Sequence, residues 1–195
     1  MSIWTKLFGK KPQSIEVIQQ DSYETLRDKL QLQIAEFKRN PQVPVFDSQK
    51  WTAPDGKHIY TNCYAYALNT PIVDKEEVLF YPSAISNKDD IILPWSERHL
   101  VSAVLRDLKF LGISYRDDDG ETTCEDGEYR IAIYTAPSFH DCPLGFHFVR
   151  QDINGEWSEK TGWDGIVQKI GTKGNTPPSY DHGIRLVKVI IVKIA

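Results

Sequence analysis

The apolar pattern of the chain changes at Gly112, and this change constrains the fold more than any other feature. Before Gly112, apolar residues recur at intervals of three and four, which is the period of an amphipathic helix. After it, β-branched and aromatic residues gather in short runs separated by turn residues, as they do in strands. Helices followed by strands are typical of the α+β class. We therefore expect N-terminal helices packed on a C-terminal antiparallel β-sheet.

Three helices are predicted before Gly112. The first follows Asp21-Ser22-Tyr23-Glu24, which has the spacing of a capping box, and ends at Asn40-Pro41. The second is short, with Asn62 as its cap and residues 63–68 as its body. The third starts after Ser96 and ends at Gly112, and it carries the longest apolar stripe of the three.

Strands are predicted at residues 129–135, 146–151 and 183–194. Asn154-Gly155 favours a hairpin turn after the second of them, with Glu156-Trp157-Ser158 on the returning strand. The hairpin places residues of the two strands opposite one another, although the sequence does not fix the register between the strands.

Length and composition favour one domain. The chain has 195 residues of which 41% are hydrophobic, enough for one well-buried core, and we divide it into an extension at 1–20 and a domain at 21–195. The formal net charge of -4 gives little electrostatic support for nucleic-acid binding. No segment has the pattern of a secretory signal or the length of a membrane span, so we expect synthesis in the cytoplasm and no membrane insertion.

Cys63 and His147 are the residues most typical of catalysis. Cys63 falls in the first turn of a predicted helix, where the helix dipole and a nearby histidine favour the thiolate and backbone amides face an oxyanion. His147 leads into a predicted strand, and the hairpin returns a carboxylate twelve residues later, at Glu159. A carboxylate there suits a third member that fixes the imidazole tautomer. Ser158 and Asp164 remain alternatives for that position.

Residues near the dyad are candidates for oxyanion or substrate binding: Tyr60, Asn62, Tyr64 and Trp157. The other cysteines, Cys124 and Cys142, allow one disulfide after export and leave at least one thiol free. We predict no metal and no cofactor, because the pairs formed with His140 and Asp141 lack the spacing of a zinc site.

The phrases Asn62-Cys63-Tyr64-Ala65-Tyr66-Ala67 and His147-Phe148-Val149-Arg150, with Gly155-Glu156-Trp157-Ser158-Glu159-Lys160, resemble the papain-like cysteine hydrolases, particularly their NlpC-type bacterial branch. They are also similar to a sparsely characterised bacterial group in which the position of Glu159 is often histidine. The resemblance covers about 25 residues. It implies a papain-like fold with Cys63 as nucleophile, His147 as base and Glu159 as orienting residue.

The resemblance favours a cysteine peptidase or amidase, including an effector or toxin that cleaves peptidoglycan and has an immunity or inhibitor protein as partner. The substrate would be a peptide or protein amide, and an exported form would leave the cell by a route without a signal peptide. Deamidation of a protein glutamine and acyl transfer use the same thioester chemistry. A non-catalytic binding module on the same scaffold is the alternative from another class.

Overall fold

The helices precede the strands along the chain, as the apolar pattern predicted. The computed structural model describes residues 22–40, 43–53, 55–57, 59–75, 79–87, 96–136, 145–163 and 165–194, so the predicted extension at 1–20 lies outside the described residues. The helical elements there are α2 (Tyr23–Arg39), the 3-10 helix η1 (Gln49–Trp51), α3 (Cys63–Ala67) and α4 (Glu97–Leu111). The strands are β1 (Ser114–Asp117), β2 (Glu128–Ala136), β3 (Gly145–Gln151), β4 (Glu156–Lys160), β5 (Val167–Lys173) and β6 (Arg185–Lys193).

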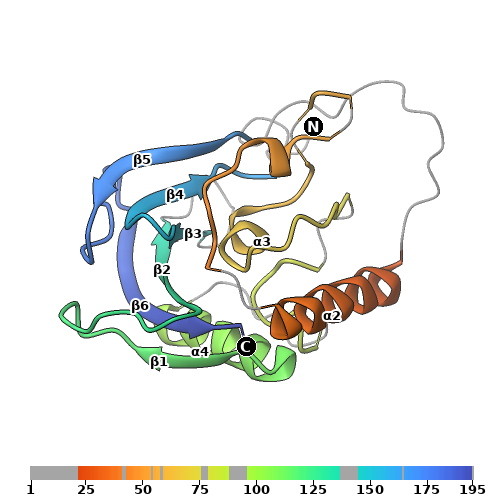
Figure 1. The fold of residues 1–195 in the computed structure, drawn as a ribbon, viewed down its shortest axis with the longest axis horizontal. Helices are drawn as coiled ribbons and strands as arrows, with labels where there is room; N and C mark the ends of the chain where they lie inside the picture. The colour runs from red at the N-terminus through yellow and green to blue at the C-terminus, as the bar shows by residue number, and fades with distance from the viewer. Residues whose placement is uncertain are drawn as a thin grey trace.

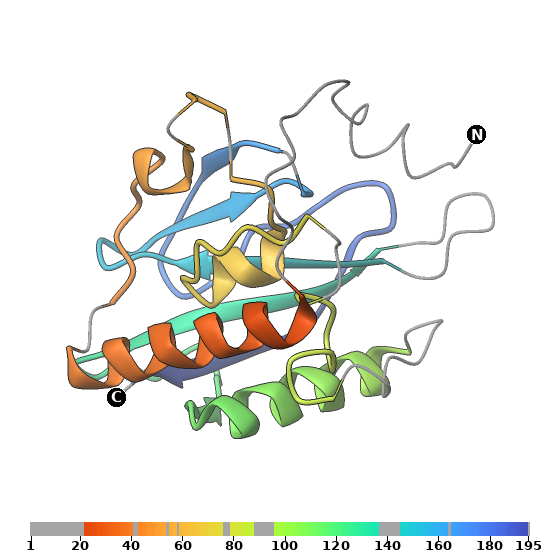
Figure 2. The same cartoon turned by 90° about the vertical axis from the view of Figure 1, so that its right-hand side faces the viewer.

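The strands form one six-stranded sheet in the order β1-β6-β2-β3-β4-β5, with antiparallel neighbours throughout. The sheet curves around α3, and α2 and α4 lie on the same side of it (Figure 1). Figure 2 looks onto this helical side. The predicted α+β class and the packing of N-terminal helices on a C-terminal antiparallel sheet are confirmed.

The main core lies between the helices and the inner face of the sheet. α2 contributes Leu26, Leu30 and Ile34, each at most 3% exposed. α4 and the inner sheet residues complete this cluster, which includes Leu100, Val104, Leu108, Ile131, Ile133, Phe148 and Ile190. Burying one such side chain contributes roughly 1.5–3 kcal/mol, so the apolar stripe of each helix accounts for its docking on the sheet.

A second apolar cluster covers the outer face of the sheet. It contains Ala132, Tyr134, Val149 and Trp157, which come from β2, β3 and β4. The connection between β5 and β6 closes over it, because Trp157 Nε1 donates to the carbonyl of Gly174 at 2.8 Å and Tyr134 Oη donates to that of Pro178 at 2.7 Å. Both faces of the central strands are therefore buried.

The helix ends follow the expected capping rules. The cap of α2 is Ser22, whose Oγ accepts the Thr25 N–H at 3.2 Å, and α4 starts at Ser96 in the same way. α4 ends at Gly112, which has a left-handed φ of 64° that glycine adopts without strain. No helix among the described residues is both long and apolar enough to cross a membrane.

Candidate active site

Cys63 is the first residue of α3. Asn62 caps the helix: its Oδ1 accepts the N–H groups of Tyr64 at 2.9 Å and Ala65 at 3.2 Å, and its Nδ2 donates to the Phe80 carbonyl at 2.7 Å. The Asn62 side chain thus joins the start of α3 to the later chain segment at Phe80. Cys63 is 4% exposed, so its thiol lies just below the surface.

A buried arginine fixes the other end of α3 to the sheet. Arg150 on β3 is fully buried and donates from Nη1 to the Tyr66 carbonyl and to Asn69 Oδ1, each at 3.0 Å. Its charge is balanced by Asp152, 3.2 Å from Nε. The hydroxyls of Tyr66 and Ser158 are 2.7 Å apart, which ties α3 to β4 as well. These contacts hold the short helix in a single position.

The connection between β4 and β5 lies beside the start of α3. Lys160 is fully buried and donates from Nζ to the carbonyls of Gly162, Trp163 and Gly165 at 3.0 to 3.1 Å. The Trp163 carbonyl also accepts the Thr61 N–H at 2.9 Å. Lys160 therefore shapes the connection that the segment before Cys63 contacts.

His147 lies on β3 at the point where the pairing with β4 ends. The described β3–β4 ladder stops at Val149 opposite Glu159, two residues after His147. The ladder between β2 and β3 extends further and pairs His147 with Tyr134. Cys63 raises the pKa of the imidazole through hydrogen bonding and charge, so the two side chains lie close together across this region. Two residues separated by more than 80 positions in the chain are thereby brought together.

Glu159 lies on the other side of the imidazole. Its Oε2 is 2.7 Å from His147 Nε2. Val149 faces Glu159 in the ladder, and since strand residues alternate in direction, His147 and Glu159 project from the same face. Because Nε2 is engaged by the carboxylate, Nδ1 is the ring nitrogen left for the thiol.

Two further side chains donate to Glu159. Tyr180 Oη donates to Oε2 at 2.5 Å, and Gln168 Nε2 donates to Oε1 at 2.7 Å. Both were missed by the sequence analysis. Gln168 lies on β5, a strand that was not predicted, and Tyr180 lies in the β5–β6 connection, where no periodic pattern marks it.

The site favours a negative carboxylate beside a positive imidazolium. Burial alone lowers the pKa of His147, but the hydrogen bonds and negative charges of Cys63 and Glu159 raise it, to about 9. Burial raises the pKa of Glu159, but the hydrogen bonds from His147, Tyr180 and Gln168 lower it, to about 2. His147 and Glu159 side chains are 14% and 7% exposed, so solvent screens the pair only weakly.

The alternatives for the third member fall elsewhere. Ser158 points to the opposite face of the sheet, where its Oγ contacts Tyr66 and donates to Asp152 Oδ2 at 2.5 Å. Asp164 lies outside the described residues. Among the candidates that the structure describes, Glu159 alone contacts the imidazole.

Three of the four predicted oxyanion or substrate-binding side chains lie in the interior. Tyr64 is fully buried, with its ring stacked on Phe148 and its hydroxyl donating to Asp107 at 3.2 Å. Trp157 is fully buried in the outer cluster, and Asn62 is occupied as the helix cap. Their side chains are engaged in the interior, and their role in oxyanion or substrate binding stays a prediction.

Tyr60, the fourth candidate, is half-buried next to the site. It stacks on Trp163 with ring centroids 6.1 Å apart, and Tyr81 lies 6.0 Å from the same indole. Tyr81 also packs edge-on against Phe146, the neighbour of His147. Partly exposed aromatic rings therefore flank the dyad.

The remaining cysteines and metal candidates give no second centre in the described residues. Cys124 is a free thiol that accepts a hydrogen bond from Arg130 at 3.3 Å, and burial raises its pKa. His140, Asp141 and Cys142 lie outside the described residues. Within the described ranges no group of three or more His, Cys, Asp or Glu side chains is placed to hold a metal ion.

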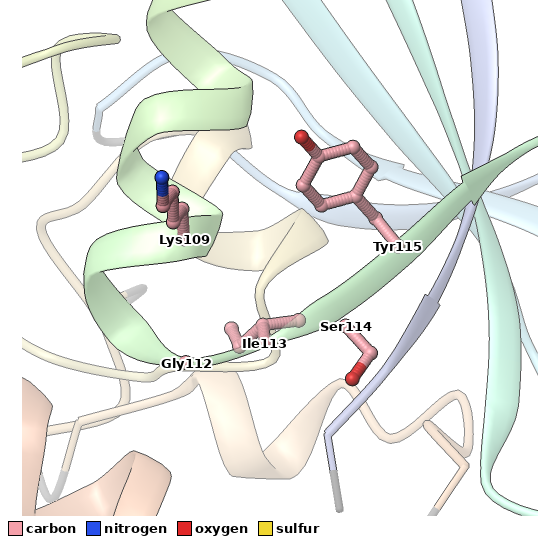
Figure 3. A pocket seen from close by; sticks show the side chains of 5 residues that line it. All are labelled: Lys109, Gly112, Ile113, Ser114 and Tyr115. Atoms are coloured by element: carbon pink, nitrogen blue, oxygen red, sulfur yellow. The ribbon is translucent and has the colours of Figure 1, made fainter.

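A hollow at the junction of α4 and β1 is separate from the dyad. It is lined by Lys109, Gly112, Ile113, Ser114 and Tyr115 (Figure 3). None of these side chains was predicted to be functional, and the hollow is wide open to solvent. The chemistry therefore points to the Cys63 region rather than to this surface.

Comparisons of the chain with protein-family models, with curated proteins and with solved structures give no match.

Proposed function

We propose that this protein is a cysteine hydrolase or amidase of papain-like arrangement, with Cys63 as nucleophile, His147 as general acid and base, and Glu159 as the residue that orients the imidazole. One observation carries the proposal: the imidazole of His147 is bound through Nε2 to the carboxylate of Glu159 at 2.7 Å and lies close enough to Cys63 for the thiol to raise its pKa. Nucleophile, base and orienting group in contact, in that order, are what covalent acyl chemistry requires.

The steps follow from the atoms in place. The thiolate of Cys63 attacks the carbonyl carbon of an amide, and the N–H of Cys63 is the first-turn amide not taken by Asn62, so it donates to the oxyanion. His147 gives its proton to the leaving amine as the C–N bond breaks, which leaves a thioester. The neutral imidazole then removes a proton from water, and the hydroxide formed releases the acid and the thiolate.

Glu159 acts on the base and not on the substrate. An ionised carboxylate at Nε2 holds the N–H there, so that Nδ1 faces the sulfur. It also favours the imidazolium, which places a positive charge beside Cys63. The low exposure of the dyad strengthens this ion pair, because fewer water molecules compete for the charges.

The first test is alkylation of Cys63 by iodoacetamide, followed by peptide mass spectrometry in the wild type and in His147→Ala. Cys124 in the same molecule is the internal reference, because burial raises its pKa and it has no histidine partner among its described contacts. We expect Cys63 to react faster than Cys124 at neutral pH and to lose that advantage in the variant. Equal, slow labelling of Cys63 in both proteins would refute the proposal and favour a binding module.

A second set of experiments distinguishes hydrolysis, deamidation and acyl transfer. Candidate protein substrates are incubated with the wild type and with Cys63→Ser, and their masses are compared. Deamidation adds about one dalton, hydrolysis produces two fragments, and acyl transfer adds the acceptor amine, because all three resolve the same thioester differently. For peptidoglycan, expression directed to the periplasm should lyse cells, while the Cys63→Ser protein in the same compartment should not.

A further inference from the structure

Tyr180 is placed on the same carboxylate oxygen that receives the imidazole. Its Oη donates to Glu159 Oε2 at 2.5 Å, and that oxygen is 2.7 Å from His147 Nε2. The phenol oxygen lies 3.4 Å from Nε2, so the hydroxyl, the carboxylate oxygen and the ring nitrogen form a compact group. Packing of the ring alone would not require this hydrogen bond.

The ring of Tyr180 is itself held in place. It meets the His147 ring edge-on, with centroids 5.4 Å apart and planes at 90°, and it meets Tyr134 at 5.1 Å and 87°. Tyr134 in turn anchors the same chain segment through its hydrogen bond to the Pro178 carbonyl at 2.7 Å. The β5–β6 connection thus delivers a rigid phenol to the back of the catalytic pair.

Glu159 needs such donors because it lies in a nearly dry environment. A buried carboxylate without hydrogen bonds takes up a proton and stops attracting a neighbouring cation. Tyr180 serves Oε2 and Gln168 serves Oε1 at 2.7 Å, so both oxygens are engaged and the plane of the carboxylate is fixed. The phenol reaches the oxygen used by the base, whereas the amide of Gln168 reaches the other.

We propose that Tyr180 is a positioning residue of the catalytic centre: its hydroxyl holds Glu159 as an oriented anion, and the anion fixes the tautomer and the ring plane of His147. The inference rests on the proposed function, since it assigns a role to Tyr180 only through Glu159. It extends the active centre from three residues to four. The fourth residue comes from a segment that covers the outer face of the sheet.

The test is Tyr180→Phe, which keeps the ring and removes the hydroxyl. The carboxyl pKa of Glu159 is followed by carbon-13 NMR and assigned by its loss in Glu159→Gln. We expect this pKa to rise by about one unit or more, because a charge-assisted hydrogen bond to the carboxylate is lost. At neutral pH the carboxylate of Glu159 is still ionised and still contacts His147, although it is held less firmly. The rate of Cys63 alkylation should therefore fall only about threefold.

Tyr134→Phe is the matched control. It removes a tyrosine hydroxyl bond of 2.7 Å from the same segment and leaves every donor to Glu159 in place. An equal change in the Glu159 titration in both variants would assign the effect to the order of the segment and overturn the proposal. An unchanged titration in Tyr180→Phe would overturn it as well, even with a reactive Cys63. An unreactive Cys63 in the wild type would refute the proposed function and, with it, this inference.

Discussion

The most direct consequence of the site geometry is that His147 should remain protonated well into the alkaline range. Its pKa is raised from 6.5 to about 9. Since about 1.4 kcal/mol corresponds to a tenfold change in an ionisation equilibrium, this rise is a net preference of about 3 kcal/mol for the imidazolium. Burial opposes it, so the contacts with Cys63 and Glu159 together supply more than the net value.

Glu159→Gln is the perturbation that isolates one of these contacts. Glutamine keeps the length of the side chain and an oxygen that accepts the Nε2 proton, but it removes the negative charge. A hydrogen bond between charged groups contributes roughly 1.5–3 kcal/mol, so the pKa of His147 should fall by about one to two units, to between about 7 and 8. Cys63→Ser should lower it separately by removing the thiolate.

The assay is a nitrogen-15 NMR titration of the imidazole. The chain has five histidines, and the His147 signal is identified by its absence in His147→Gln. The midpoint of the His147 signal is compared between variants rather than assigned to one proton, because neighbouring groups contribute to it. A wild-type midpoint at or below 6.5, or a midpoint that Glu159→Gln leaves unchanged, would refute the account of the site.

The same variant has a signature in stability. The folded pKa of His147 lies above its unfolded value, so its contribution is complete below pH 6.5 and is lost as the pH rises to about 9. The folded pKa of Glu159 lies below its unfolded value, so its contribution is complete above pH 4.5 and is lost as the pH falls to about 2. The wild type should therefore exceed Glu159→Gln most in unfolding free energy between pH 4.5 and 6.5, as measured by urea denaturation.

Three further predictions test the groups around the dyad. In His147→Ala, alkylation of Cys63 at neutral pH should slow about tenfold or more, because the thiolate loses its cation; an unchanged rate would exclude activation by the histidine. Burial raises the pKa of Asp107 to about 6, so as pH rises from 4 to 7 the wild type should lose up to about 3 kcal/mol relative to Asp107→Asn in urea unfolding; a constant difference would contradict this. Arg150→Met should lower the free energy of unfolding by about 3–5 kcal/mol, because it leaves Asp152 buried without its partner, and adding Asp152→Leu should restore part of that loss. Additive losses in the double variant would count against the pairing.

The sequence predicted the elements that carry the dyad because their signals are local. Asn62 followed by small and helix-favouring residues indicated α3, and Asn154-Gly155 indicated the hairpin between β3 and β4. These two signals were enough to place Cys63 at a helix start and Glu159 near His147. The capping and stop signals of α4 were equally local, and they were confirmed at Ser96 and Gly112.

Sequence alone left the choice between Ser158 and Glu159 open for a physical reason. Neighbouring residues on a strand point to opposite faces, so a slip of one residue in the hairpin exchanges their roles. The observed register pairs Val149 with Glu159, which sends the carboxylate toward the imidazole and the Ser158 hydroxyl toward α3. Only the packing on both faces of the sheet decides between the two registers.

Tyr180 and Gln168 were out of reach of any local pattern. β1 and β5 are short or mostly half-exposed edge strands, so they lack the apolar alternation that marks a strand, and Gln168 was overlooked with β5. Tyr180 follows two prolines in a connection without regular structure. Tyr64 and Trp157 were chosen for closeness in sequence, and that closeness did not indicate that their large rings are fully buried in the core.

β3 links the two halves of the candidate site more tightly than their separation in the chain suggests. One side of the strand carries His147, while the other carries Phe148 and Arg150, which hold α3 by stacking on Tyr64 at 4.6 Å and by donating to the Tyr66 carbonyl at 3.0 Å. His147 and the helix that carries Cys63 are thus positioned by neighbouring residues of one strand. Because a shift of β3 would displace both at once, their mutual geometry is set by local side-chain packing, and the burial of Arg150 contributes to the site as well as to the fold.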